Sequence, residues 1–131
     1  MAKEAISPLH VGPPVGQYSH GIKVRGSALL FIAGQVALDE HGQLVGHDDI
    51  ERQTRQVLSN VRKIVEAAGG MMGDIVQVTI YHTNLDRHHE TARRVRNEYF
   101  TPPYPAGTLV EVARLADPAY LIEMDAIAAL E

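Results

Sequence analysis

Two side chains of this sequence have a polar group in a setting where it can act on a ligand. Glu123 lies in the otherwise apolar segment 120–128, where a carboxylate is costly to bury unless it is paired. It can act as a general base or hold a water molecule, or it can make a hydrogen bond at a subunit interface. Tyr18 follows a Pro- and Gly-rich segment. It can contact a ligand, or it can simply hold that segment against a sheet.

Positive charge that can meet an anionic ligand is concentrated in one predicted helix, which contains Arg87, Arg93, Arg94 and Arg96. The chain has 12 Lys and Arg against 16 Asp and Glu, for a net charge of −4. We therefore interpret this cluster as a solvated helix face. Within the cluster, Arg93 is the candidate for a cation that binds an anionic ligand. A chain with this charge is not expected to bind nucleic acid by neutralising phosphates.

Other chemistries find little support in the sequence. The seven His have none of the spacings of a metal site and there is no Cys, so we expect no metal. No phosphate-cradling Gly loop, dinucleotide fingerprint or Ser-His-Asp arrangement is present, so we expect no cofactor. No apolar run approaches the length of a membrane span. We therefore expect a single domain over residues 1–131, cytoplasmic and without a membrane partner.

Hydrophobic periodicity predicts two helices that position these residues. Apolar residues recur on one helical stripe from Ile50 to Ala68, with Asp48 or Asp49 able to cap its start. A second helix is predicted over 86–100, capped by Asp86 and stopped by the prolines that follow.

Five strands are predicted around these helices. The segments 21–25 and 28–34 are expected to form a hairpin across a Gly26-Ser27 turn, the second strand being buried on both faces. The others are 74–83, 108–113 and 120–128. The order β-β-α-β-α-β-β predicts an α+β fold with two helices on one face of a mixed sheet. The uncovered face, which carries Gln77, Thr79 and Tyr81, is expected to meet another subunit.

The segment 104–115, YPAGTLVEVARL, has a residue pattern like that of a family signature. It resembles a strand of the RidA/YjgF imine/enamine deaminase family, which typically reads Pro-Ala-Arg-Thr/Ser-x-Val-Glu-Val. Seven stretches resemble the family in order along the chain: 16–19, 32–35, 53–61, 65–69, 74–79, 110–115 and 122–128. The resemblance implies a chorismate-mutase-like subunit, a homotrimer, and three small-molecule clefts between neighbouring subunits.

In family members with deaminase activity, the signature arginine binds the carboxylate of a 2-imino or 2-enamino acid. A water then adds to the C=N carbon and ammonia is released. The resemblance places the family's tyrosine and glutamate on Tyr18 and Glu123, and the glycine of its turn on Gly34. These two polar residues are therefore the expected catalytic pair.

The substrate anchor departs from the family pattern. Gly107 stands at the arginine position, Ala33 replaces a serine, and Leu109 replaces a small polar residue or a cysteine. A helix asparagine falls near Arg93. Gly107 can empty the cleft for another ligand, or it can allow a bulge or close backbone approach. The expected substrate contacts are Ala33, Gly34, Arg93, Gly107, Thr108 and Leu109.

These observations lead to two hypotheses. The first is a hydrolase of the imine/enamine deaminase type with altered specificity. The second is a non-catalytic trimeric module that binds a small molecule in the same cleft. The endoribonuclease activity named in the family's older label finds no support in the charge or in the small set of aromatic residues.

Overall fold

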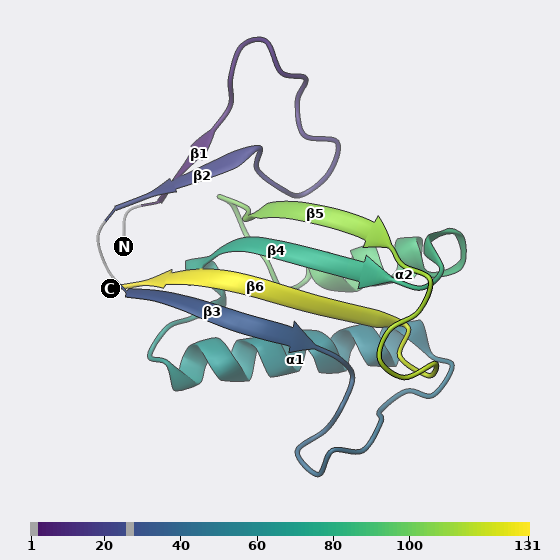
Figure 1. Cartoon of the computed structure of the whole chain (residues 1–131). Helices are drawn as coiled ribbons and strands as arrows, with labels where there is room; N and C mark the ends of the chain where they lie inside the picture. The colour runs from purple at the N-terminus through teal and green to yellow at the C-terminus, as the bar shows by residue number, and fades with distance from the viewer. Residues whose placement is uncertain (1–2, 26–27) are drawn as a thin grey trace.

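A four-stranded mixed sheet with both long helices on one face forms the body of the structure (Figure 1). The computed structural model describes residues 3–25 and 28–131. Its elements are β1 (Lys3–Ile6), β2 (Gly21–Val24), β3 (Ala28–Gln35), α1 (Ile50–Ala67), a short 3-10 helix (Met72–Asp74), β4 (Ile75–His82), α2 (Leu85–Asn97), β5 (Ala106–Glu111) and β6 (Ile122–Leu130).

The strand order of this sheet is β3-β6-β4-β5, with β4 and β5 parallel and the other pairs antiparallel. Helix α2 makes the crossover between the parallel strands, as such a connection requires. The α+β class and the two helices on one face of a mixed sheet are confirmed. Neither the additional strand β1 nor the separate two-stranded sheet that it forms with β2 was predicted.

The core lies between α1 and the sheet. Val57, Leu58, Val61 and Val65 of α1 are fully buried, as the predicted stripe requires. Asp49 caps the helix by accepting a hydrogen bond from the Arg52 amide at 3.1 Å.

A buried amide connects α1 to the start of β6. The Gln53 side chain donates to the carbonyls of Gly46 (3.1 Å) and Ala119 (2.9 Å), and it accepts from the Leu121 amide at 2.9 Å. All of its hydrogen-bonding groups but one lone pair are thereby used in the core. Because Leu121 immediately precedes β6, this contact also fixes the position of Glu123.

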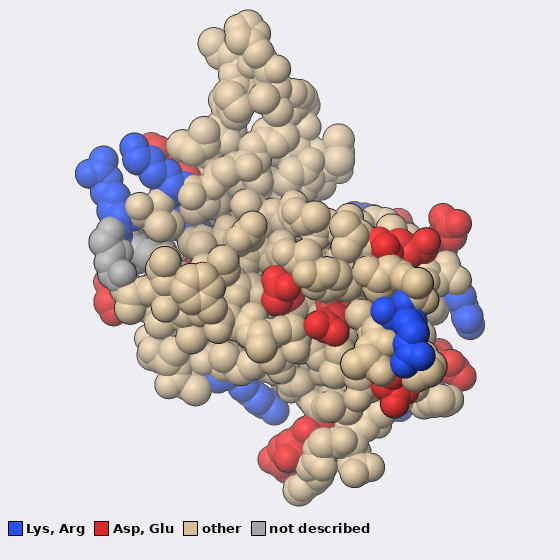
Figure 2. Space-filling view, in the orientation of Figure 1, with Lys and Arg blue, Asp and Glu red and all other residues tan. Residues whose placement is uncertain are grey.

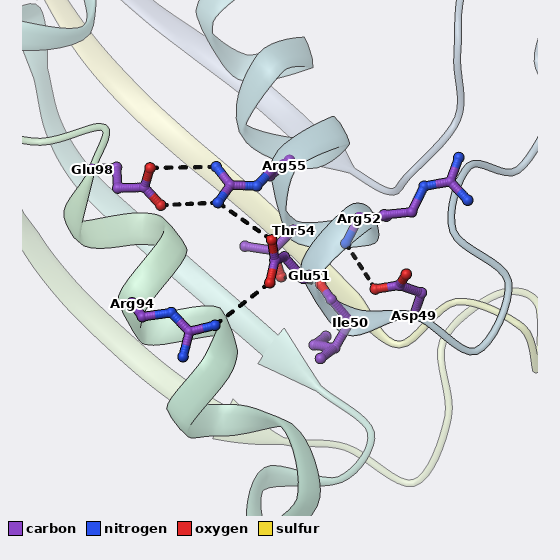
Figure 3. Close-up of polar contacts among 8 residues, drawn as sticks. All are labelled: Asp49, Ile50, Glu51, Arg52, Thr54, Arg55, Arg94 and Glu98. Atoms are coloured by element: carbon purple, nitrogen blue, oxygen red, sulfur yellow. Dashed lines mark hydrogen bonds and ion pairs between the residues drawn. The ribbon is translucent and has the colours of Figure 1, made fainter.

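Ion pairs join the outer faces of the two helices (Figure 3). Arg55 of α1 contacts Glu98 at 3.1 Å and Glu51 at 3.5 Å, and Arg94 of α2 contacts the same Glu51 at 3.5 Å. Such exposed pairs add little stability each. They do show that Arg94 points towards α1. The first turn of α2 is capped by Asn84, which accepts from the Arg87 amide, and not by Asp86 as predicted.

The predicted hairpin between 21–25 and 28–34 is wrong, and its Gly26-Ser27 turn lies outside the described residues. Strand β2 pairs with β1 instead, from Lys3 opposite Val24 onwards. The Ser19 amide donates to Pro105 O at 3.0 Å, and Lys3 Nζ donates to a carbonyl just before β4 at 2.7 Å. These contacts hold the N-terminal segment beside β4 and β5, where β2 pairs with β1 and not with β3.

The prediction that 28–34 is buried on both faces is also wrong. Ile32 is buried, but Leu29 and Phe31 are 57% and 70% exposed. The reason is that none of the described helices covers their face of the sheet, which we call the open face. Figure 2 views this face and shows acidic side chains near its middle, surrounded by uncharged ones. No helix in the described residues is long and apolar enough to cross a membrane.

Candidate functional site

A pocket of about 340 Å³ lies on the helix side of the sheet. It is bounded by residues 15–18, by α2, by the strand pair β4–β5 and by Phe100. Val78 and Ile80 line it from β4 and are both buried, 6% exposed each. A cavity of this size is in the range of small-molecule sites.

Gly107 and Leu109 line the pocket from β5, because they pair in register with Val78 and Ile80. The register is continuous across the glycine, so Gly107 does not form a bulge. A Cβ at this position would meet nothing closer than Val78 Cγ2 at 3.4 Å, an ordinary contact. The glycine is therefore not required by the backbone, and its consequence is open space in the pocket.

Tyr18 lies against this strand, with its Cβ 3.9 Å from where a Gly107 Cβ would be. Its phenol oxygen accepts a hydrogen bond from the Val15 amide at 3.3 Å, and its ring meets His20 edge to face. The next residue, Ser19, bonds to the backbone before β5 through both its amide and its hydroxyl. Tyr18 thus both helps to hold the N-terminal segment in place and faces the pocket.

Helix α2 supplies the polar wall. His89, Arg93, Arg96 and Asn97 line the pocket, and their spacing puts them on one helical face. Arg93, the predicted candidate, is ion-paired with Glu90 at 2.7 Å. His89 and Arg96 were not predicted. His89 lies four residues before Arg93 and Arg96 three residues after it, and this helical spacing was the signal that could have found them. Among the described residues that line the pocket there is no Asp or Glu.

Behind this wall lies a buried histidine that sequence reasoning also missed. His82, the last residue of β4, is fully buried, and neither ring nitrogen has a hydrogen-bond partner in the described structure. Burial, together with the charges of Arg96, His89 and His88, lowers its pKa to about 4. His82 is therefore neutral at physiological pH and adds no charge to the pocket.

Glu123 and Gly34 lie elsewhere, on the open face. Glu123 pairs in register with Tyr81, and both side chains alternate with buried residues that face the helices. Tyr81 donates to Asp125 Oδ2 at 3.1 Å, and this bond raises the tyrosine pKa. The predicted contact Ala33 adjoins Gly34 in β3 and is exposed.

The predicted site residues are thus divided between two faces of one sheet. Tyr18 and Arg93 lie in the helix-side pocket, as do the three β5 positions Gly107, Thr108 and Leu109. Ala33, Gly34 and Glu123 lie away from it in β3 and β6. A single chain therefore does not bring the two expected catalytic residues, Tyr18 and Glu123, together. No cluster of three or more potential metal-ligating side chains occurs among residues 3–25 and 28–131.

Comparison with known proteins places this architecture in a family. A RutC family protein of Pyrococcus abyssi is 42% identical over 129 residues, which are 98% of each chain. The crystal structure of the Rid family protein YyfB of Yersinia pestis, described as of unknown function, has a TM-score of 0.89 at 32% identity, covering 99% of this chain and 100% of that one.

A third relative was solved with a ligand. The structure of Escherichia coli TdcF with bound serine has a TM-score of 0.72 at 30% identity, covering 98% of this chain and 99% of that one. The family model described as endoribonuclease L-PSP matches residues 10–130. The chain therefore belongs to the endoribonuclease L-PSP family, which is the RidA/YjgF family that the sequence motifs indicated.

Proposed function

We propose that this protein is a diverged imine/enamine deaminase, a hydrolase that binds a small molecule in clefts between the subunits of a homotrimer. The observation that carries the proposal is the division of the site between two faces of the sheet. Tyr18 and Gly107 lie at the helix-side pocket, whereas Glu123 lies on the open face. A complete site then needs the pocket of one copy and the Glu123 carboxylate of its neighbour.

In the proposed reaction, Glu123 holds a water and accepts its proton as the oxygen adds to the C=N carbon. That proton passes to the imine nitrogen and gives an amino alcohol. Collapse of the amino alcohol breaks the C–N bond as the second proton of the water moves from the hydroxyl oxygen to the leaving nitrogen. The products are a carbonyl compound and ammonia. Tyr18 contacts the ligand, as do Gly107, Thr108 and Leu109 of β5. The proposal keeps the cytoplasmic location expected from the sequence, and it includes no cofactor.

The experiment that tests this proposal uses imines formed in situ by an amino acid oxidase, with ammonia release followed over a panel of amino acids. We expect acceleration for at least one imine, and loss of that acceleration in Glu123→Gln, which removes the proton acceptor with little change in shape. A pocket-filling Gly107→Phe variant should also be inactive.

Mixing these two inactive variants provides the sharper test of a shared site. Mixed trimers form sites that combine a native pocket from one copy with a native Glu123 from the other. Partial recovery of activity after the subunits are unfolded and refolded together is therefore expected. No recovery from a mixture that does form trimers would contradict the division of the site between subunits.

A non-catalytic trimeric binding module is the second candidate, and the observation that favours it is Gly107. The guanidinium that holds the substrate carboxylate in active relatives has no counterpart at this position. If no imine in the panel is turned over faster than without protein, while small molecules still bind in the pocket, this second candidate replaces the first.

A further inference from the structure

The two arginines of the pocket differ in how their charge is balanced. Arg93 has a carboxylate partner in Glu90, at 2.7 Å. The Arg96 guanidinium has no ion pair and no hydrogen bond in the described structure, and its Nη1 atom is buried without an acceptor. A buried charge without a partner is costly, so native structures nearly always provide one.

The groups around Arg96 do not supply the missing negative charge. Its neighbours with titratable side chains are His82, His89 and Arg93, of which none is acidic. Burial and the charge of Arg93 lower the pKa of Arg96 to about 10, which still leaves the guanidinium protonated at neutral pH. The pocket therefore contains a permanent positive charge that lacks a counter-charge.

The remaining walls define what kind of anion fits. Val78, Ile80, Phe100 and Leu109 present apolar surface, and the missing side chain at residue 107 leaves room above β5. Arg96 lies one residue before the end of α2, where the helix dipole is negative and disfavours a dianion such as phosphate. A planar carboxylate, by contrast, matches the two parallel donors of a guanidinium.

We propose that Arg96 anchors the carboxylate of a small acid with an apolar body, and so holds the ligand from α2 where active relatives hold it from β5. The inference rests on the proposed function only in using the same pocket, because binding does not require turnover. It replaces Arg93, the cation that the sequence indicated, with a residue whose charge is free.

The first test is the binding of benzoate, benzamide and inorganic phosphate to the wild-type protein by isothermal titration calorimetry. Benzoate should bind with a Kd tighter than about 10 mM, a modest value for so small a ligand. Benzamide has the same shape without the charge and should bind at least about 10-fold more weakly, since charge-assisted bonds are the stronger ones. Phosphate should bind more weakly than benzoate.

The second test uses variants of α2. Arg96→Gln should weaken benzoate binding at least about 30-fold, the low end for losing one partner of a desolvated charge pair. Arg96→Lys keeps the positive charge but not the two parallel donors of the guanidinium, and it should lose less benzoate affinity than Arg96→Gln. The matched control is Arg94→Gln, the same change on the same helix at a residue that pairs with Glu51 outside the pocket. It should bind benzoate like the wild type.

A stability measurement separates ligand binding from a structural role. Without ligand, Arg96→Gln should melt at the same temperature as the wild type or higher, because it removes an unpaired buried charge. A structural arginine would behave in the opposite way, and the melting temperature would fall. Benzoate should raise the melting temperature of the wild type but not that of Arg96→Gln.

The inference is overturned if the wild type does not bind benzoate, if benzamide binds equally well, or if Arg96→Gln binds benzoate unchanged. Its failure is distinct from failure of the proposed function. Benzoate binding that depends on Arg96, without turnover of any imine, leaves the anion site standing and removes the catalysis. If ammonia release depends on Glu123 but benzoate binding does not depend on Arg96, the proposed function remains and the anion site is removed.

Discussion

Gly34 and Glu123 fit together only because residue 34 has no side chain. A Cβ at Gly34 would lie 2.0 Å from Glu123 Oε2 and 2.9 Å from its Cδ. The glycine is not in the left-handed region, since the positive-φ glycines among the described residues are Gly42, Gly46 and Gly69. The strand therefore does not need glycine here for its backbone, and the space above residue 34 is occupied by the carboxylate.

Gly34→Ala is the direct test of this relationship. The alanine methyl group must displace the Glu123 carboxylate, which is the far end of a flexible and partly exposed side chain. We expect a small loss of unfolding free energy, below about 1 kcal/mol, together with a loss of deaminase activity as large as that of Glu123→Gln. The double variant Gly34→Ala, Glu123→Gln should be no worse than either single variant. Additive losses of activity would show that Gly34 acts independently of the carboxylate.

His82 makes the stability of the protein depend on pH. Its pKa is about 4 in the folded protein and about 6.5 in the unfolded chain. Between these values the unfolded chain binds a proton that the folded protein does not, so stability is lost as the pH falls from about 6.5 to about 4. The loss is on the order of 3 kcal/mol at most. His88 and His89, whose pKa values burial also lowers, act in the same direction.

Urea unfolding at about pH 7.5 and about pH 5 measures this effect. His82→Leu should lose less stability on acidification than the wild type, since it removes a buried group that has no hydrogen bond to give up. The exposed His41, 77% accessible, provides the control, and His41→Gln should retain the wild-type difference. Equal pH dependence in the wild type and His82→Leu would show that other groups cause it.

The open face leads to a prediction about assembly. Leu29 and Phe31 are exposed on β3 beside the acidic middle of this face, and a mixed apolar and polar surface of this kind suits contact with another subunit. Light scattering should give a mass near three times the 14.4 kDa chain. Phe31→Glu should shift the protein towards monomers. A wild-type protein that remains monomeric at micromolar concentration would remove both the trimer and the shared site.

RNA binding is expected to be negligible. The net charge is −4. In α2, Arg93 pairs with Glu90, Arg94 pairs with Glu51, and Arg96 lines the pocket. Affinity for single-stranded RNA at physiological salt should be weaker than a Kd of about 10⁻⁴ M. Tight binding with a steep salt dependence, measured by fluorescence anisotropy, would mean that this helix face is a phosphate-binding surface after all.

Local patterns in the sequence predicted the elements well. The stripe from Ile50 onwards predicted α1, and the sequence at 74–83 placed Gln77, Thr79 and Tyr81 on the face of β4 that none of the described helices covers. Pairing between distant strands was the weak point. Nothing near residues 21–25 shows that β2 pairs with β1, because that choice depends on contacts with Pro105 and with the start of β4.

The site shows the same limit. That Gly107 faces the helices follows from its register with Val78, which a single strand sequence does not contain. Without that register, the opposite placement of Tyr18 and Glu123 could not be foreseen. The pattern of α2 groups Arg96 with Arg93 and gives Arg93 a carboxylate three residues earlier, in Glu90, but it does not show that the Nη1 atom of Arg96 is buried. That burial depends on how α2 packs against the sheet.

Restoring the family's arginine is the last prediction. The wild type should show little acceleration of ammonia release from 2-iminopropanoate or 2-iminobutanoate, because β5 offers no guanidinium for their carboxylates and an anchor at Arg96 on α2 would hold so short a substrate in another position. Gly107→Arg should restore part of this activity. A Cβ fits at this position, with Val78 Cγ2 at 3.4 Å, and the longer side chain can extend into the pocket. The gain should be partial because Ala33 and Leu109 still differ from the family pattern.

Two controls make this prediction decisive. Adding Glu123→Gln to Gly107→Arg should abolish the gain, since the proton acceptor is lost with little change in shape. Gly107→Met fills similar space without the charge and should remain inactive. Rapid wild-type turnover of either short imine would refute the argument from the missing anchor. A folded, trimeric Gly107→Arg variant that gains nothing would favour the non-catalytic binding module, because the anchor would then be present and the chemistry still absent.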